Sequence, residues 1–214
     1  MGKTRFVVLD GPAGRIEGIL QGDGRVPIRR LAVICHPHPL GGGTMNTRVV
    51  HRTARALERA GHCVLRFNFR GVGASEGSHD QGRGEQDDTR AALAWLRSAH
   101  PGLAVTVAGF SFGSWVGLKV GCFDEDVDAL VGIALPVTLF DFGFITGCAK
   151  RRLFLHGTAD ELAPFDALER LYRGLAGPKE LVTLEGGSHL LTDHLDEVEE
   201  SISAFASALP GPDG

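Results

Sequence analysis

The sequence predicts an α/β fold in which a mainly parallel, eight-stranded sheet is flanked by helices. Apolar runs rich in Val, Ile, Leu and Phe alternate with longer stretches of helical period, an order typical of βαβ units around a parallel sheet. The chain has 214 residues, of which 43% are apolar and 22% charged, which is enough to bury one sizeable core. We therefore expect one domain over residues 1–209, followed by a disordered Pro- and Gly-rich tail over residues 210–214.

The expected strands begin with an antiparallel pair. Residues 5–10 and 15–21 flank the sequence Gly-Pro-Ala-Gly, which favours a turn and therefore a hairpin at one edge of the sheet. Short apolar runs between turn residues predict six more strands, at residues 31–35, 63–69, 104–108, 129–134, 152–155 and 180–184. Stretches of helical period, each followed by Gly, Pro or the next strand, predict helices at residues 47–60, 85–100, 112–121, 163–174 and 193–208.

The charge balance argues against polyanionic partners. The formal net charge is -4, and no block rich in Lys or Arg is present, so neither nucleic acid nor an anionic membrane surface is an expected partner. Residues 1–8 run directly into the first expected strand without a long apolar stretch. We therefore expect a cytoplasmic protein, and both a monomer and a homodimer stay open.

The sequence offers no pattern typical of a metal or cofactor site. It contains four cysteines, which are Cys35, Cys63, Cys122 and Cys148. They form no C-x-x-C pair and no zinc-binding spacing, so we expect free thiols packed in the interior. His36 and His38 lie two positions apart, but the prolines that follow each of them and the lack of a third nearby ligand disfavour a metal site. Neither a metal nor a cofactor is expected.

Residues 109–113 form a G-x-S-x-G motif around Ser111. In this motif the serine occupies a tight strand-to-helix turn with strained backbone angles, and the flanking glycines leave room for it. The apolar run before the motif and the helical stretch after it supply that context, and a helix N-terminus favours developing negative charge. Ser111 is therefore predicted to be a catalytic nucleophile.

A serine nucleophile of this kind needs an acid and a base, which follow it in the order Ser, then Asp or Glu, then His. Asp160 and His189 come directly after the last two expected strands, where the carboxyl ends of parallel strands meet. We predict that His189 is the general base and that Asp160 fixes its tautomer. The weaker alternatives are His194 as the base and Glu161 as the acid.

Acyl transfer also needs backbone N–H donors that face the developing oxyanion. One is expected from Phe112, directly after the nucleophile, and the other from the loop after the strand at residues 31–35. Two prolines in that loop lack an N–H. His38 and Leu40 are therefore the candidates for the second donor.

Several further segments surround these residues: CHPHPLGGGTM at 35–45, FNFRGVGASEG at 67–77 and GRGEQDD at 82–88. Together with the Ser111, Asp160 and His189 segments they span residues 31–191. Over this span the chain resembles the small, lidless bacterial serine hydrolases of the α/β-hydrolase superfamily, related to the serine aminopeptidase and dienelactone hydrolase branches. The resemblance implies an α/β-hydrolase fold, an esterase- or thioesterase-like activity without cofactor, and His38 rather than Leu40 as the second donor. The sequence departs from the family pattern after His189, where leucine stands instead of an aromatic residue.

The link between the expected strands at residues 129–134 and 152–155 decides whether a cap domain is present and contributes to the prediction of the acyl pocket. Caps in this fold normally follow the sixth strand, and only residues 135–151 are available there, too few for a domain. The link is very apolar, so Leu139 and Phe140 are expected either to wall an acyl pocket or to pack against the sheet. Phe110 and Leu190, beside the nucleophile and the base, complete the expected pocket.

The predicted function is hydrolysis of carboxylic esters or thioesters that carry small or medium acyl groups, through an acyl-enzyme. One alternative is amide hydrolysis by an aminopeptidase-like peptidase. The other is a noncatalytic binding module, since a fold does not guarantee an activity.

Overall fold

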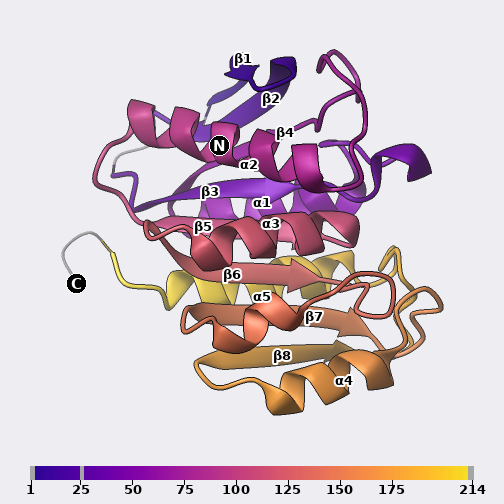
Figure 1. Cartoon of the computed structure of the whole chain (residues 1–214). Coiled ribbons are helices and arrows are strands. Elements are labelled where there is room, and N and C mark those ends of the chain that lie inside the picture. The colour runs from indigo at the N-terminus through magenta and orange to yellow at the C-terminus, as the bar shows by residue number, and fades with distance from the viewer. Residues whose placement is uncertain (1–2, 25–26, 212–214) are drawn as a thin grey trace.

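One sheet of eight strands forms the centre of the computed structural model, which describes residues 3–24 and 27–211 (Figure 1). The strands are β1 (Lys3–Gly11), β2 (Gly14–Asp23), β3 (Arg30–Cys35), β4 (His62–Phe67), β5 (Val105–Phe110), β6 (Val127–Ile133), β7 (Arg151–Gly157) and β8 (Lys179–Leu184), in the spatial order β1-β2-β4-β3-β5-β6-β7-β8. The hairpin of β1 and β2 lies at one edge and pairs antiparallel with β4, and every pair from β4 to β8 is parallel. The predicted fold class and edge hairpin are confirmed.

Helices cover both faces of this sheet. Figure 1 shows α2 (Arg83–Ala99), α3 (Phe112–Phe123) and α4 (Phe165–Gly174) in front of the sheet, and α1 (Arg48–Arg59) and α5 (Leu195–Ser207) behind it. Each face holds its own cluster of buried apolar side chains, and β3, β4 and β5 are buried at every position, as expected for strands between two helical layers. No helix in the described part of the chain is long and apolar enough to span a membrane.

Every predicted strand and helix is present among the described residues, with ends within two residues of those predicted. One difference has a cause outside the local sequence. β4 ends at Phe67 instead of residue 69, because the amide of Phe69 donates to Nε2 of His36 at 3.0 Å rather than to a neighbouring strand.

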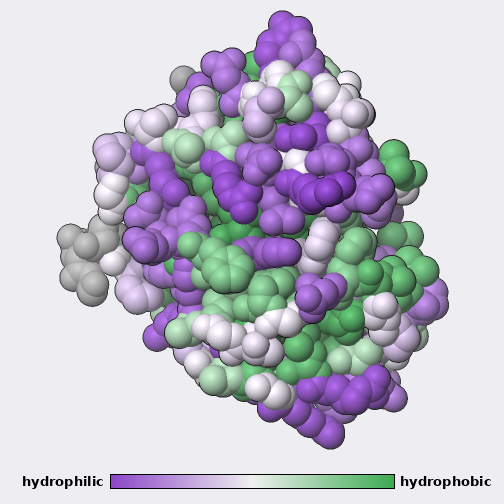
Figure 2. All heavy atoms as spheres, in the orientation of Figure 1, coloured by the Kyte–Doolittle hydropathy of each residue, from purple (hydrophilic) through white to green (hydrophobic). Residues whose placement is uncertain are grey.

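The link between β6 and β7 is short and contains the 3-10 helix η2 (Gly143–Gly147). No separate cap domain is formed within residues 3–24 and 27–211, as predicted. Figure 2 shows apolar residues gathered at the lower right of this face, where Figure 1 places the link. The carboxyl ends of the parallel strands are therefore not covered by a domain.

The C-terminal segment is anchored where the tail was expected to begin. The carbonyl of Pro210 accepts a hydrogen bond from Arg30 Nη1 at 2.8 Å. Residues 212–214, the rest of the expected tail, lie outside the described residues.

Candidate active site

Ser111 stands between the end of β5 and the start of α3. Its backbone has φ 54° and ψ -124°, a left-handed conformation that is strained for any residue except glycine. A bond of 2.9 Å from its N–H to the carbonyl of Ile133 fixes this turn to β6. The side chain is thereby held at the carboxyl end of the sheet, directly before a helix N-terminus.

The two glycines of the motif are required by close backbone contacts. A Cβ atom at Gly113 would lie 2.3 Å from the carbonyl oxygen of Cys35, and one at Gly109 would lie 2.2 Å from the carbonyl oxygen of Gly113. Real Cβ atoms do not approach backbone so closely. Only glycine at both positions allows the helix to begin this near to β3, so the G-x-S-x-G pattern has a direct steric cause.

His189 and Asp160 complete a continuous chain of hydrogen bonds with Ser111. His189 Nε2 lies 2.8 Å from Ser111 Oγ, and His189 Nδ1 lies 2.8 Å and 3.0 Å from the two carboxylate oxygens of Asp160. Asp160 and His189 are only 5% and 4% exposed. The imidazole can therefore accept the serine proton at Nε2 while Nδ1–H donates to the carboxylate.

The Asp160 carboxylate is held in place by the backbone after β7. Its Oδ1 accepts hydrogen bonds from the amides of Leu162 at 3.0 Å and Ala163 at 2.8 Å. Burial alone would raise the pKa of Asp160, but the bonds from His189 and Ala163 outweigh burial, and the pKa lies below its usual range. Asp160 is therefore ionised at neutral pH, as a partner of the imidazole must be.

His156, on β7, packs against Asp160 from the interior. Its Nε2 donates to the carbonyl of Ala163 at 2.6 Å and lies 3.5 Å from Asp160 Oδ2. Burial lowers the pKa of this histidine, so it is neutral and adds no charge beside the carboxylate. The sequence analysis did not assign His156 this position, because only folding brings it beside the loop that it supports.

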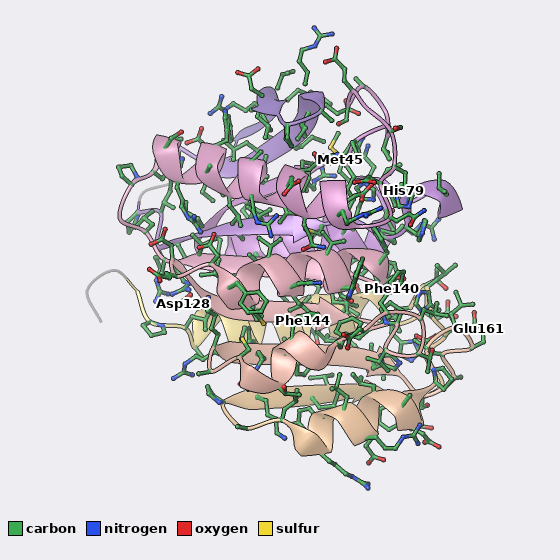
Figure 3. The ribbon with its side chains drawn as sticks, in the orientation of Figure 1. Met45, His79, Asp128, Phe140, Phe144 and Glu161 are labelled. Carbon is green, nitrogen blue, oxygen red and sulfur yellow. The ribbon has the colours of Figure 1, made fainter. Side chains whose placement is uncertain are left out.

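The two alternative residues lie elsewhere. His194 is the N-cap residue of α5, and its Nε2 donates to the carbonyl of Glu185 at 2.9 Å, away from Ser111. Glu161 follows Asp160 at the right-hand ends of the strands (Figure 3), and its Oε2 lies 3.5 Å from the backbone N–H of His189 rather than beside the imidazole. The geometry therefore favours His189 over His194 and Asp160 over Glu161.

The loop after β3 distinguishes the two candidate oxyanion donors. The N–H of Leu40 donates to Nδ1 of His38 at 3.2 Å, and the side chain of Leu40 is 78% exposed. The N–H groups of His38 and Phe112 have no hydrogen-bond partner among the described residues, and the two rings pack with centroids 4.8 Å apart. His38 and Phe112 thus have available N–H groups, whereas the N–H of Leu40 is occupied.

His36 holds this loop against the neighbouring strand end. Its Nδ1–H donates to the carbonyl of Pro37 at 2.7 Å, and its Nε2 accepts from the amide of Phe69 at 3.0 Å. Burial lowers its pKa to about 4, so the neutral ring needed for both bonds is maintained. The sequence analysis considered His36 only as a metal ligand and missed this role.

A cleft of about 280 Å³ opens at Ser111 and His189. It is lined mainly by the glycine-rich loop after β3 and by apolar side chains; the lining residues are Pro37, His38, Gly41, Gly42, Gly43, Thr47, Phe110, Ser111, Leu162, His189 and Leu190. The expected pocket residues Phe110 and Leu190 are among them. Leu162 was not anticipated, because its position depends on the turn that binds Asp160.

Leu139 and Phe140 are not among the residues that line this cleft. Their amides both bond back to the carbonyl of Pro136, at 3.0 Å and 3.1 Å, and this turn directs Phe140 onto Trp115 of α3, with ring centroids 4.6 Å apart. Figure 3 shows Phe140 beside α3. Of the two alternatives that the sequence left open, the contact of Phe140 with Trp115 favours packing against the body of the domain for this residue.

Comparisons with known proteins show which family of proteins this chain resembles in sequence and fold. The sequence model of the family described as alpha/beta hydrolase fold matches residues 33–145. The solved structure of an α/β serine hydrolase homologue from Coxiella burnetii is 36% identical, with a TM-score of 0.88, and the match covers 96% of this chain and 98% of that chain. A Xanthomonas campestris protein, described as an α/β serine hydrolase without lid, is 34% identical with a TM-score of 0.86, over 97% of each chain. An uncharacterized protein of Rickettsia prowazekii is 32% identical over 208 residues, which cover 93% of this chain and 87% of the relative.

Proposed function

The chain belongs to the α/β hydrolase fold family, and on this basis we propose that it is a serine hydrolase that cleaves carboxylic esters or thioesters through an acyl-enzyme. The observation that carries the proposal is the hydrogen-bonded series from Ser111 Oγ through both nitrogens of His189 to Asp160, with separations of 2.8 Å at both steps. A serine hydroxyl is a weak nucleophile, and a base in direct contact with it is what activates it.

The first half-reaction follows from these contacts. His189 Nε2 takes the proton of Ser111 as Oγ attacks the acyl carbonyl, and the carboxylate of Asp160 stabilises the imidazolium that forms. The protonated imidazole then gives its proton to the departing alkoxide or thiolate. Water, activated by His189 in the same way, then attacks the acyl-serine, and the carboxylic acid is released.

The oxyanion would be stabilised by two backbone amides and a helix. The N–H of Phe112 is at the first position of α3, where the helix dipole favours negative charge. The N–H of His38 faces no other acceptor within the described residues. Both donors are fixed before substrate arrives, because the His36 bond to Phe69 and the φ of Ser111 fix their loops.

The cleft supports acyl groups of small or medium size. Its volume of about 280 Å³ lies near the lower limit of pockets that bind small molecules, roughly 300 Å³. Leu162 and Leu190 stand at its mouth and are 54% and 59% exposed, so a longer chain would lie partly in solvent. No separate cap within the described chain closes over it.

Ser111→Ala tests the proposal. We expect kcat for p-nitrophenyl acetate or butyrate to fall by at least about 10⁴-fold and labelling by a fluorophosphonate probe to disappear, with an unchanged circular dichroism spectrum. Ser188→Ala is the matched control, because this serine adjoins His189 in the sequence without contacting Ser111 Oγ; it should keep the labelling. Turnover near the wild-type rate in Ser111→Ala would refute the proposal.

The leaving group is tested with the wild-type protein. Parallel assays of p-nitrophenyl esters, acyl-CoA thioesters and aminoacyl anilides compare the three acyl-transfer classes at equal enzyme concentration. Because no observation favours an amine-binding site, we expect kcat/KM for the anilides to be the lowest. A preference for the anilides would instead support a peptidase, and probe labelling without turnover of any substrate would leave the reaction class to be redefined.

A further inference from the structure

Three side chains of different chemistry meet at the amino ends of the parallel strands, far from the Ser111 cleft. Asp23 ends β2, Cys63 lies at the start of β4, and His100 is the C-cap residue of α2. His100 Nε2 lies 3.7 Å from Cys63 Sγ and 3.8 Å from Asp23 Oδ1, and the three ligand atoms all lie within 4.8 Å of one another. In Figure 1 this is the left-hand side, where α2 ends, opposite the carboxyl ends of the strands.

These separations fit the dimensions of a zinc site. Zinc is bound tetrahedrally at about 2.3 Å from sulfur and about 2.0–2.1 Å from nitrogen or carboxylate oxygen. At tetrahedral angles these lengths place two ligand atoms roughly 3.3–3.6 Å apart. The observed 3.7 Å and 3.8 Å exceed those values by only a few tenths of an ångström. The third pair, Asp23 and Cys63, is within 4.8 Å, so side-chain movements of about 1 Å or less would bring the three atoms to one ion.

The carboxylate of Asp23 is already oriented by a second contact. Arg5, on β1, donates to Asp23 Oδ2 through Nε at 3.2 Å and Nη2 at 3.0 Å. This bond occupies one oxygen and leaves Oδ1, the oxygen nearer His100, for a cation. Fixing a ligating carboxylate in this way is a common feature of metal sites.

We propose that Asp23, Cys63 and His100 form a zinc site with one protein ligand each and a fourth position taken by water. Zn²⁺ displaces the proton of the buried Cys63 thiol to solvent, and the thiolate and the Asp23 carboxylate then bring two negative charges that balance the ion. Arg5 is 53% exposed, so water screens its positive charge. The exposed fractions of Asp23 and His100, 30% and 18%, provide access to the buried sulfur. The site joins three elements and lies apart from the nucleophile, so we expect metal binding to stabilise the fold without changing ester turnover at Ser111.

This site escaped the sequence analysis, which expected no metal and a packed thiol at Cys63. Local zinc patterns depend on two cysteines or histidines a few positions apart. Here the ligands lie in three separate segments of the chain, and only the pairing of β2 with β4 and the return of α2 bring them together.

Cobalt(II), which takes zinc geometry and gives a thiolate charge-transfer band in the near ultraviolet, is the probe. Titration of the metal-free full-length chain should produce this band at one equivalent of Co²⁺, and Zn²⁺ should abolish it. Cys63→Ala and His100→Gln should each lose the band. The controls Cys148→Ala and Ser111→Ala should keep it, because neither residue belongs to the site.

A stability measurement provides an independent readout. With Zn²⁺ at 100 times its dissociation constant, the unfolding equilibrium constant should fall about 100-fold in the wild type and stay unchanged in His100→Gln. Because His100 is partly exposed, this variant is expected to fold, and its metal-free urea midpoint verifies that. The proposal is overturned if no charge-transfer band forms, if the band persists in His100→Gln, or if it requires Cys148.

Discussion

His38 contributes two different groups to the loop after β3. Its imidazole Nδ1 accepts the N–H of Leu40 at 3.2 Å, and its own N–H is left available beside Phe112. Burial, with the nearby His79 as a second cause, lowers the pKa of the ring, so the nitrogen that accepts the Leu40 bond is unprotonated at neutral pH. The backbone and side-chain roles can be separated by substitution.

His38→Pro removes the N–H, while His38→Ala removes only the ring. The φ of -54° at residue 38 is compatible with proline, so the loop can keep its course. We expect His38→Pro to lower kcat for ester hydrolysis by about 10²–10³-fold, the usual cost of one oxyanion donor. His38→Ala should cost much less, because its amide is intact; equal losses in steady-state kinetics would contradict the assignment of this donor.

The candidate site residues that could be predicted from the sequence are marked by residues close to them in the chain. Ser111 is marked by two flanking glycines, at which a Cβ atom would lie only 2.2–2.3 Å from backbone oxygens. Asp160 and His189 are marked by their positions directly after strands. His36, His156 and Leu162 carry no such signal. Their partners in the site lie on other strands or depend on a turn, so only the folded chain shows them.

At the scale of elements, α1 and α5 are joined through one buried carboxylate. Glu199 of α5 is 3% exposed, and its oxygens lie 2.8 Å from Arg52 and 2.7 Å from Arg59, with Arg55 at 3.6 Å. All three arginines belong to α1 and are partly exposed. Arg52 donates a charge-assisted hydrogen bond to Oε2, whereas Arg55 and Arg59 face Oε1 as ion pairs. Because the carboxylate is buried, these contacts are stronger than ordinary surface ion pairs.

Glu199→Ala is therefore expected to lower the free energy of unfolding by about 2 kcal/mol, the range for hydrogen bonds to charged groups. Urea unfolding at neutral pH measures this. Glu200→Ala is the matched control on the same helix, because Glu200 is exposed, and its effect should stay within about 0.5 kcal/mol. Similar losses in both variants would show that the Glu199 contacts do not stabilise the helix pair.

Strand and helix positions were predictable because apolar periodicity and Gly or Pro stops are local properties. The beginning of α4 shows the limit. Residue 163 fits the helical pattern, yet the helix begins at Phe165, because the N–H of Ala163 donates to Asp160 and its carbonyl accepts from His156. These two bonds hold residue 163 outside the helix, which therefore begins two residues later than predicted.

At the scale of the whole molecule, two buried neutral histidines make the fold sensitive to acid. Burial, with Arg30 nearby, lowers the pKa of His62 to about 3, and burial lowers that of His36 to about 4. In the unfolded chain both take up a proton near pH 6.5. The unfolded state therefore binds more protons below that pH, and stability falls as the pH drops from 6.5 toward the folded pKa values.

His62→Gln should remove one of these two contributions. Between pH 7 and pH 5 the wild type should lose about 2 kcal/mol through each histidine, so the loss in the variant should be about 2 kcal/mol smaller. Urea unfolding of both proteins at the two pH values measures the loss of stability from pH 7 to pH 5 in each. Comparing these two losses cancels any effect of the substitution that does not depend on pH. An identical pH dependence in the two proteins would contradict the account.

The link between β6 and β7 remains too short to cover Ser111, and this has a kinetic consequence. In the proposed acyl-enzyme, the acyl group on Ser111 would lie in a cleft that is open to solvent, and no described segment of the chain would close over it to select the nucleophile that reaches it. Water and any small alcohol that fits the cleft then compete by concentration. The protein would thus act as an acyl-transfer catalyst whose product ratio is set by the medium, with hydrolysis as the outcome in dilute aqueous solution.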